Sequence, residues 1–486
     1  MTERLSALDA SFLYLETANA PLHTGSVVLF QESPGALDHQ RVVKLIQERI
    51  AFLPRYRQRL REVPGGLAHP VWVDDAHFDA TYHVRRSALP APGSIESLYD
   101  LVGRIMSRPL DRRRPLWEVY LVEGVQGRRF ALLTKTHQAM VNGLSALDIA
   151  EVILDESATP SPQPVSTWQP SPEPSSAELM VGAISENLQR PRQLFTRLGA
   201  TVSAGSRTVG DVWATLREAA RPAEHNPLTV SIGAQRRFAT VDLRLEDFKT
   251  VRQRTSGSIT DVALGVVTGA LRSWLFSRGI PVTATTTVRT LVPVSLAASD
   301  PRSAEVSAVV LDLPVGEGDP VIRVQRIAFD MARHGADSHV TGARAMSELV
   351  GFAPATLHAL GARVGAGLAA RAYSLIVTNV PGPQVPLYAG GARMLATYPV
   401  VPIGERQAMS IGITSYAGGV FVGLNADRDA MDDLDLFATA MQEAMSELLD
   451  TTRARKDRRL QVAGGQSTVS TRSTKSRAKK QVTSDD

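Results

Sequence analysis

Hydrophobic and polar positions change period repeatedly along the chain, which predicts strands that alternate with helices. A short apolar run at Gly25–Phe30 has the length and composition of a strand, and helical spacing of apolar residues follows over Val42–Phe52. Two further apolar runs, Trp117–Gly124 and Phe130–His137, are joined by a turn at Gln126–Gly127 and predict a β-hairpin. The first part of the chain therefore predicts an α/β arrangement.

The same alternation returns after a break that is rich in proline and serine, residues 158–176. Such a segment cannot pack as a core element, so it marks a boundary. Beyond it, the pattern predicts strands and a long helix at Arg236–Leu243, Ser258–Phe276, Thr290–Val294 and Leu375–Val380. Pro293 within the third of these segments suits an edge strand or a bulge.

Four regions follow from this pattern. We expect an N-terminal half, a Pro/Ser-rich crossover with a helical linker, a C-terminal half and a disordered basic tail, at residues 1–157, 158–235, 236–450 and 451–486. A length of 486 residues with 43% hydrophobic residues is consistent with two halves that each bury a core.

The amino-acid composition and charge exclude several classes of site and of binding partner. The chain has no cysteine, so disulfides, thiolate metal sites and thiol nucleophiles are excluded. The net charge of +4 comes from the tail, where ten Lys/Arg against three Asp/Glu give +7 and leave 4 − 7 = −3 for residues 1–450. The body therefore does not have the charge of a nucleic-acid-binding protein.

No signal for membrane insertion is present in the sequence. The first residues lack an apolar segment, and no stretch reaches about 18 uncharged apolar residues. We expect a cytoplasmic chain, with peripheral contact to the inner face of the membrane or to a lipid droplet as a further expectation. The basic tail would make that contact, and the alternative is a tail that is simply solvated.

The residues most suited to chemistry are His137–Gly143, between a predicted strand and the helical pattern of Leu144–Leu154. Polar clusters at strand-to-helix turns commonly form the sites of α/β proteins. Taken alone, His137 fits a structural histidine as well as a functional one. The dinucleotide-like match at Gly365–Ala370 lies inside a helical pattern instead of after a strand, and His334 and His339 lack a carboxylate or thiolate ligand set that would complete a metal site.

Several segments together resemble the wax ester synthase/diacylglycerol acyltransferase family. His137–Gly143 resembles its His-His-x-x-x-Asp-Gly motif, and Arg114–Trp117 resembles its Pro-Leu-Trp element. Further blocks similar to the family occur in order along residues 3 to 448, at Leu5–Phe12, Pro70–Asp75, Arg289–Ser295 and Thr378–Pro383.

The resemblance implies a fold, an activity and site residues. The fold would be the α/β, two-subdomain, chloramphenicol-acetyltransferase-like architecture, with mixed sheets flanked by helices and a channel between the halves. The activity would be transfer of a long-chain acyl group from acyl-CoA to a lipid alcohol such as diacylglycerol, with acyl-CoA as a substrate and no cofactor or metal. The motif would supply the catalytic positions His137, Gln138 and Asn142. Substrate binding would involve Gly143, Pro115, Leu116, Trp117 and Asp261.

The sequence differs from the family motif at two positions that carry the family chemistry. The second histidine of the motif, the general base in the family, is Gln138 here, and the family aspartate is Asn142. An amide has no usable pKa near neutrality, and a general base is worth about 10²–10⁴-fold in rate. The family Asn-Asp pair of the second half appears as Thr260-Asp261.

Three interpretations remain open from the sequence. His137 could replace the base only if the turn is reshaped, because adjacent residues of an extended strand face opposite sides. Alternatively, the chain is a lipid or acyl-CoA binding protein that keeps the channel. A third interpretation is an acyltransferase whose acceptor carries its own base.

Overall fold

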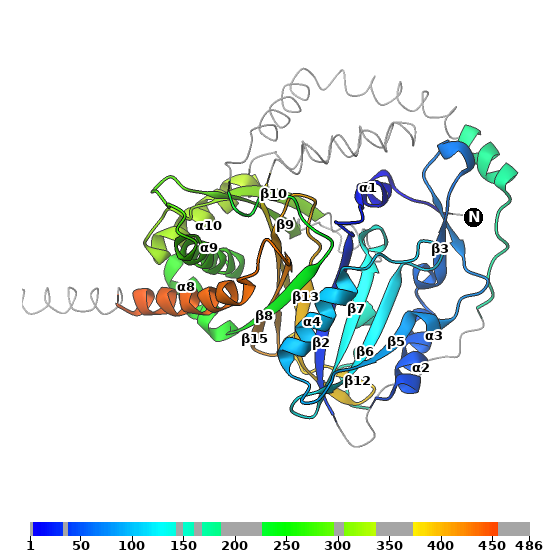
Figure 1. The fold of residues 1–486 in the computed structure, drawn as a ribbon, viewed down its shortest axis with the longest axis horizontal. Coiled ribbons are helices and arrows are strands. Elements are labelled where there is room, and N and C mark those ends of the chain that lie inside the picture. Colours follow the sequence, from blue (N-terminus) through cyan, green and yellow to red (C-terminus); the bar gives the residue numbers. More distant parts are fainter. Residues whose placement is uncertain are drawn as a thin grey trace, which may run out of the picture.

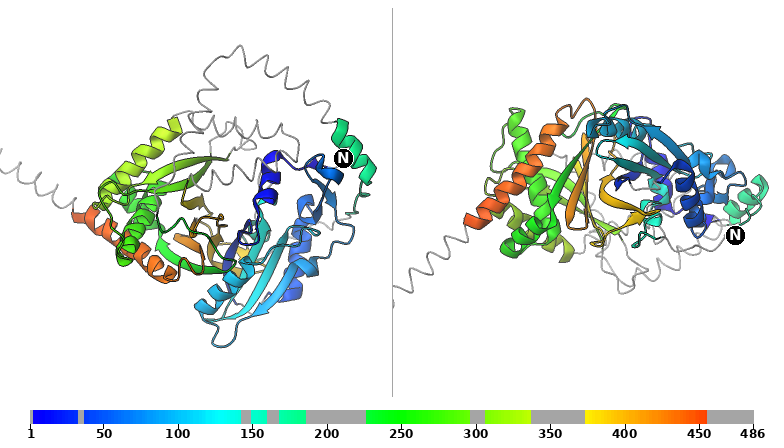
Figure 2. Two further views of the ribbon diagram at one scale, coloured as in Figure 1. Left: turned by 45° about the horizontal axis from the view of Figure 1, so that its top comes forward. Right: turned by 90° about the horizontal axis from the view of Figure 1, so that it is seen from below.

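Two six-stranded mixed sheets and one small three-stranded sheet form the described part of the protein (Figure 1). The computed structural model describes residues 3–32, 37–141, 149–159, 168–185, 226–295, 306–336 and 373–454. Each large sheet carries helices, so the predicted α/β class with two subdomains is confirmed. Figure 2 shows the N-terminal half (blue and cyan) beside the C-terminal half (green and orange) in two further views.

The N-terminal sheet has the strand order β12-β13-β2-β7-β6-β5. Its strands are β2 (His23–Gln31), β5 (Val84–Ala88), β6 (Trp117–Val125), β7 (Arg129–His137), β12 (Tyr388–Ala389) and β13 (Ala392–Val400). The β6–β7 pair is antiparallel, which confirms the predicted hairpin. The β5–β6 pair is parallel, so the sheet is mixed.

The C-terminal sheet has the strand order β10-β9-β11-β14-β15-β8. Its strands are β8 (Arg236–Arg244), β9 (Val288–Ser295), β10 (Val306–Leu313), β11 (Leu375–Pro381), β14 (Met409–Tyr416) and β15 (Gly419–Asp427). Pro293 lies in β9, which is not an edge strand as a whole. The pairing of β9 with β11 ends at Leu291, so at Pro293 the strand pairs with β10 alone. The missing N–H of the proline therefore removes no hydrogen bond to a second neighbouring strand.

Helices pack on both sheets. In the N-terminal half they are α1 (Ala7–Leu15), α2 (His39–Ile50), α3 (Ala80–His83), α4 (Ile95–Met106) and α5 (Ile149–Val152), and in the C-terminal half α8 (Leu245–Thr255), α9 (Ile259–Ser277), α10 (Pro320–Ala336) and a helix at 434–454. The last helix continues past residue 450, and Thr452 is buried, so residues 451–454 belong to the folded C-terminal half and not to the predicted tail; residues 455–486 lie outside the described part.

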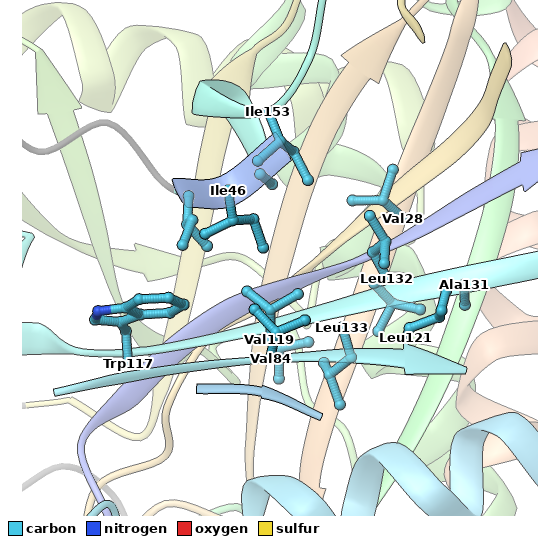
Figure 3. Close-up of a cluster of buried hydrophobic side chains, with 14 of the residues drawn as sticks. Val28, Ile46, Val84, Trp117, Val119, Leu121, Ala131, Leu132, Leu133 and Ile153 are labelled. Atoms are coloured by element: carbon cyan, nitrogen blue, oxygen red, sulfur yellow. The ribbon is translucent and has the colours of Figure 1, made fainter. Parts of the chain in front are cut away.

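Helix α9 is central to the second core. It is the one helix of the described part that is long and apolar enough to cross a membrane, yet 72% of its apolar window is buried inside the protein. Its side chains pack in one cluster with those of β8, β14, α8 and the helix at 434–454. The first core lies on the N-terminal sheet, where Trp117, Val119, Leu121 and Leu132 are fully buried (Figure 3).

The small sheet receives part of the Pro/Ser-rich crossover. Its strands are β1 (Glu3–Arg4), β3 (Gln58–Arg61) and β4 (Val71–Asp74). Glu173 of the crossover pairs with Arg59 at 2.6 Å, and Leu179 of the helical stretch Ser176–Ser185 is buried against Val71 and Val73. Residues 168–185 therefore pack on the N-terminal half; residues 160–167 and 186–225 lie outside the described part.

Strand β13 joins the two halves. It follows the C-terminal strand β11 in sequence but pairs with β2 of the N-terminal sheet, an exchange that the predicted division at 236–450 does not contain. Pro399 of β13 lies against Gly412 and Gly423, which are register partners on β14 and β15. A Cβ atom on Gly423 would stand 1.9 Å from the Pro399 carbonyl oxygen, so the close approach of the sheets requires glycine.

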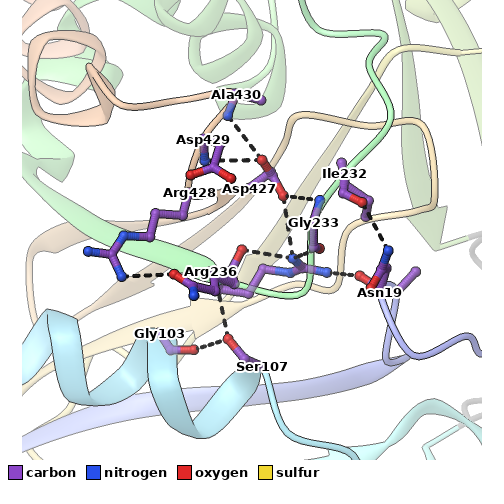
Figure 4. Close-up of polar contacts among 12 residues, drawn as sticks. Asn19, Gly103, Ser107, Ile232, Gly233, Arg236, Asp427, Arg428, Asp429 and Ala430 are labelled. Carbon is purple, nitrogen blue, oxygen red and sulfur yellow. Dashed lines mark hydrogen bonds and ion pairs between the residues drawn. The ribbon is translucent and has the colours of Figure 1, made fainter.

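A buried arginine forms a second junction between the halves (Figure 4). Arg236, at the start of β8, donates to the carbonyl oxygens of Gly233 and Asn19 and lies 3.7 Å from Asp427. Its backbone N–H donates to Ser107 Oγ at 3.1 Å, just after α4. Because this guanidinium is almost fully buried, its hydrogen bonds to both halves offset the cost of removing it from water.

Substituting Gly423 tests the contact between the sheets. We expect Gly423→Ala to destabilise the protein by about 1–3 kcal/mol, because the new methyl group meets backbone atoms of Pro399 that cannot rotate away. The matched control is Gly182→Ala, where a Cβ would contact nothing within 4 Å and helix propensity predicts a small gain. Thermal melting of the three proteins is the measurement, and a Gly423→Ala variant that melts with the wild type would contradict the contact.

Candidate active site

A cavity of about 970 Å³ lies between the two halves. Residues of β2 and β13 line it from the N-terminal sheet, and residues of β9, β11 and β14 line it from the C-terminal sheet. Exposed residues border it at Glu405 and Arg406 and also at Glu156 and Pro381. The position and size of this cavity fit a small-molecule or lipid site at a domain junction.

The motif lies where β7 ends beside this cavity. His137 is the last residue of β7, and Gln138 begins the short 3-10 helix η3 (Gln138–Met140). Gln138 lines the cavity, and its side-chain Oε1 is buried without a protein hydrogen-bond partner. Its backbone N–H donates to the Leu22 carbonyl at 2.9 Å, which fixes the turn against β2. The amide at the position of the family base is therefore directed to the cavity.

His137 faces the opposite side, into a buried polar cluster with Glu16 and His23. The Glu16 carboxylate lies 3.1 Å from His23 Nε2 and 3.5 Å from His137 Nε2, and the two imidazole rings meet edge to face at 5.7 Å. Arg112 donates to the same carboxylate at 2.6 Å, and the Leu22 N–H donates at 3.2 Å. The cluster thus joins α1, β2, β7 and the segment before β6.

Burial and these neighbours set the charges of the cluster. Burial alone would raise the pKa of Glu16, but the interactions with His137 and His23 outweigh it and hold the pKa far below its usual range. Burial lowers the pKa of His23 to about 4, despite the opposing effect of Glu16. Near pH 7 the cluster therefore contains an ionised Glu16 and a neutral His23.

The hydrogen bonds of His137 decide its tautomer. The backbone N–H of Ala139 donates to His137 Nδ1 at 3.0 Å, so Nδ1 carries no proton and Nε2 does. This Nε2–H faces Glu16. Both ring nitrogens are thus directed to protein groups, and neither can take a proton from a substrate in the cavity. His137 positions the turn, and no histidine is among the described residues that line the cavity.

The segment Pro115–Trp117 lies beside the end of β7, the strand that carries His137. All three are buried, and none is among the described residues that line the cavity. The Leu116 carbonyl accepts from the backbone N–H of His137 at 2.9 Å. Trp117 Nε1 donates to the Tyr56 carbonyl at 2.8 Å. These contacts give the element a structural role beside the site, without contact to the cavity.

The remaining predicted residues are placed elsewhere or lie outside the described part. Asp261 is in the capping box of α9: its carboxylate accepts from the Ser258 N–H at 2.6 Å, and its own N–H donates to Ser258 Oγ. It does not line the cavity, although the neighbouring Thr260 accepts from Asn379 on β11 at 3.0 Å. Asn142 and Gly143 lie outside the described residues.

Sequence reasoning missed Glu16, His23 and Arg112. Glu16 and His23 are close in sequence but Arg112 is distant, and neither period nor spacing shows that the three meet. The available signal was weak: a glutamate and a histidine at the two ends of a short loop before an apolar strand. Within the described ranges, no group of three or more His, Asp or Glu side chains is arranged to hold a metal ion.

The sequence of this chain is similar to those of known proteins along most of its length. Residues 5–263 match the wax ester synthase/diacylglycerol acyltransferase catalytic domain, and residues 304–449 match the C-terminal domain of the same proteins. The probable diacylglycerol O-acyltransferase tgs3 of Mycobacterium tuberculosis is 42% identical over 265 residues, covering 52% of this chain and 97% of that protein. The probable diacylglycerol O-acyltransferase tgs2 of the same species is 31% identical and covers 90% of this chain and 97% of its own.

Solved structures extend the comparison. The wax ester synthase/diacylglycerol acyltransferase of Marinobacter aquaeolei has a TM-score of 0.66 and 27% identity, covering 92% of this chain and 99% of that one. The starter condensation domain of rhizomide synthetase has a TM-score of 0.54 at 13% identity, covers 93% of this chain and 94% of that domain, and shares the fold alone. The chain belongs to the wax ester synthase/diacylglycerol acyltransferase family.

Proposed function

We propose that this chain transfers a long-chain acyl group from acyl-CoA to the hydroxyl of a lipid alcohol, with diacylglycerol as the simplest acceptor and triacylglycerol as the product. Family membership supports the reaction class. The observation that carries the proposal is the cavity of about 970 Å³ between the halves, with Gln138 of the motif in its lining. Acyl-CoA is a substrate in this reaction, and no cofactor is needed.

The reaction balances without a redox partner. The acceptor oxygen attacks the thioester carbonyl, the bond from that carbon to sulfur breaks, and the hydroxyl proton ends on the released CoA thiol. Binding both substrates in line within one cavity removes much of the entropic barrier. The Gln138 side-chain amide can donate a hydrogen bond to the carbonyl oxygen as negative charge develops there.

Gln138 cannot do what the family histidine does. Proton removal from the acceptor then falls to water or to the departing thiolate, which leaves the rate about 10²–10⁴-fold below that of a chain with a general base. The neighbouring His137 is turned toward Glu16 and does not replace it. This observation also favours a second candidate function, a lipid or acyl-CoA binding protein that retains the cavity.

Restoring the general base at position 138 distinguishes an acyltransferase from a lipid or acyl-CoA binding protein. We expect Gln138→His together with Asn142→Asp to raise acyl transfer by about 10²-fold or more, and Gln138→His alone to raise it less. The measurement is steady-state transfer from radiolabelled long-chain acyl-CoA to a panel of alcohols, with acyl-CoA affinity determined separately.

A control variant excludes a nonspecific effect of histidine. Gln325→His introduces the same side chain on the exposed face of α10 and should leave the rate unchanged. Wild-type protein as active as the double variant would contradict a limiting role of Gln138. Acyl-CoA binding with no transfer in any variant would favour the binding protein.

A lipid acceptor also calls for contact with a lipid surface. We propose that the protein attaches peripherally to the inner face of the membrane or to a lipid droplet through the basic residues after 454, each worth about 1 kcal/mol near an anionic surface. Removing residues 455–486 should weaken flotation with anionic vesicles, more at low salt than at high salt, and should not change flotation with neutral vesicles. Equal flotation of both proteins with anionic vesicles would refute this role.

A further inference from the structure

A tyrosine outside the motif lines the same cavity from the C-terminal half. Tyr373 is partly buried and lies two residues before the start of β11. The residue that follows it, Ser374, is fully buried, and its N–H donates to the Arg289 carbonyl at 2.8 Å. The Ser374 hydroxyl accepts from Asn226 Nδ2 and Thr229 Oγ1, both at 2.9 Å. These three hydrogen bonds fix the backbone next to Tyr373.

The side-chain amide of Gln407 orients the Tyr373 hydroxyl. Gln407 is buried, and its Oε1 accepts from the Gly404 N–H at 2.9 Å. Because Oε1 already has a donor, the NH2 group is the part of the amide that donates to the phenol oxygen of Tyr373. Burial raises the pKa of Tyr373, and the hydrogen bond from Gln407 lowers it by less. The Tyr373 hydroxyl therefore stays protonated at physiological pH.

The Tyr373 hydroxyl is left with a proton to donate. Among the described residues its one hydrogen-bonding partner is Gln407, and that partner donates to it. A phenol oxygen that accepts a hydrogen bond still donates through its own O–H. Because Tyr373 lines the cavity, the acceptor for this proton comes from what occupies the cavity, either water or a ligand. A ligand oxygen that replaces water here keeps the hydrogen bond, and an apolar group loses it.

Tyr373 and the motif lie at the same end of the cavity. The Gln138 N–H donates to the Leu22 carbonyl at 2.9 Å. Two residues before Leu22, Ala20 packs in one buried cluster with Ile403. Ile403 directly precedes the turn that holds the amide beside Tyr373. This series of contacts connects the motif to the tyrosine across the two halves, and Gln138, Ala20 and Tyr373 all line the cavity.

The polar atoms at this end of the cavity complement one kind of ligand. Gln138 Oε1 is buried without a protein partner and accepts hydrogen bonds only, so it suits the proton of a hydroxyl group. The Tyr373 O–H is a donor and suits an oxygen that has no proton of its own. A hydroxyl and a carbonyl oxygen bound together would satisfy both groups. Acyl transfer to a lipid alcohol brings these two groups together.

We propose that the Tyr373 hydroxyl, oriented by Gln407, donates a hydrogen bond to a carbonyl oxygen of the bound substrate. The carbonyl belongs either to the thioester of acyl-CoA or to an ester of diacylglycerol, and both oxygens accept in the same way. Tyr373 is then a substrate-binding residue supplied by the C-terminal half, opposite Gln138 of the N-terminal half. For the reaction, the inference rests on the proposed function; for binding, it does not.

The test removes the hydroxyl and compares ligands with and without a carbonyl. Tyr373→Phe keeps the ring. One ligand pair is a ketone analogue of acyl-CoA, with a methylene group between carbonyl and sulfur so that no transfer occurs, and the alkyl-CoA thioether of the same length. The other pair is a diacylglycerol and the matching dialkylglycerol ether. Calorimetry should show that Tyr373→Phe weakens binding of the carbonyl-bearing member of one pair by about three- to tenfold and leaves its carbonyl-free partner unchanged. The pair that responds identifies which carbonyl Tyr373 binds.

Two further variants serve as controls. Tyr120→Phe removes a hydroxyl that donates to Glu118 on β6, away from the cavity, and should leave all four affinities unchanged. Gln407→Leu should reduce the preference for the carbonyl-bearing ligand and add nothing further to that preference in the Tyr373→Phe background. The ratio of two affinities on one protein does not depend on the fraction that is folded. Equal changes for both members of each pair, or no change, would overturn the inference. A carbonyl preference that depends on Tyr373, without acyl transfer by the wild type, would support the inference while the proposed function fails.

Discussion

The buried carboxylate of Glu16 is the interaction on which the geometry of the site depends. It faces His23 on β2, His137 at the end of β7 and Arg112 before β6, and it follows directly after α1. Without these partners an ionised carboxylate at this depth would be costly. With them, it lies within 3.5 Å of both imidazole rings, and His137 points away from the cavity. The alternation of the strand then leaves Gln138 in the cavity.

The two halves meet through backbone contacts that tolerate little change. The Gly412–Gly423 pair admits Pro399, and this approach holds β13 between the sheets. The same strand supplies Met394 and Thr397 to the cavity, and its partner β2 supplies Val28. The shape of the cavity is therefore a consequence of the strand exchange. A chain whose second half kept β13 in its own sheet would lack one wall of the cavity.

The sequence predicted much of this structure because most elements bury an apolar face with a clear period. The β6–β7 hairpin, α9 and β11 lie close to where the pattern predicts them. Nothing local indicates that β13 pairs with β2, because strand partners are chosen by tertiary packing. For the site, resemblance located the motif, and alternation predicted that His137 and Gln138 face opposite sides. Glu16 and His23 were missed, since their meeting depends on how α1 docks. Asp261 was expected near substrate but caps α9.

His137 is directed to Glu16 and Ala139, and this orientation prevents it from acting as the base. Nitrogen NMR of the protein with labelled histidine, assigned with a His137→Gln variant, tests it directly. We expect His137 to have a bare Nδ1 and a protonated Nε2 at neutral pH. We also expect His23 to stay neutral until the pH approaches its lowered pKa of about 4. A protonated Nδ1 on His137, with Nε2 free to accept a proton from a substrate, would show that His137 can serve as the base.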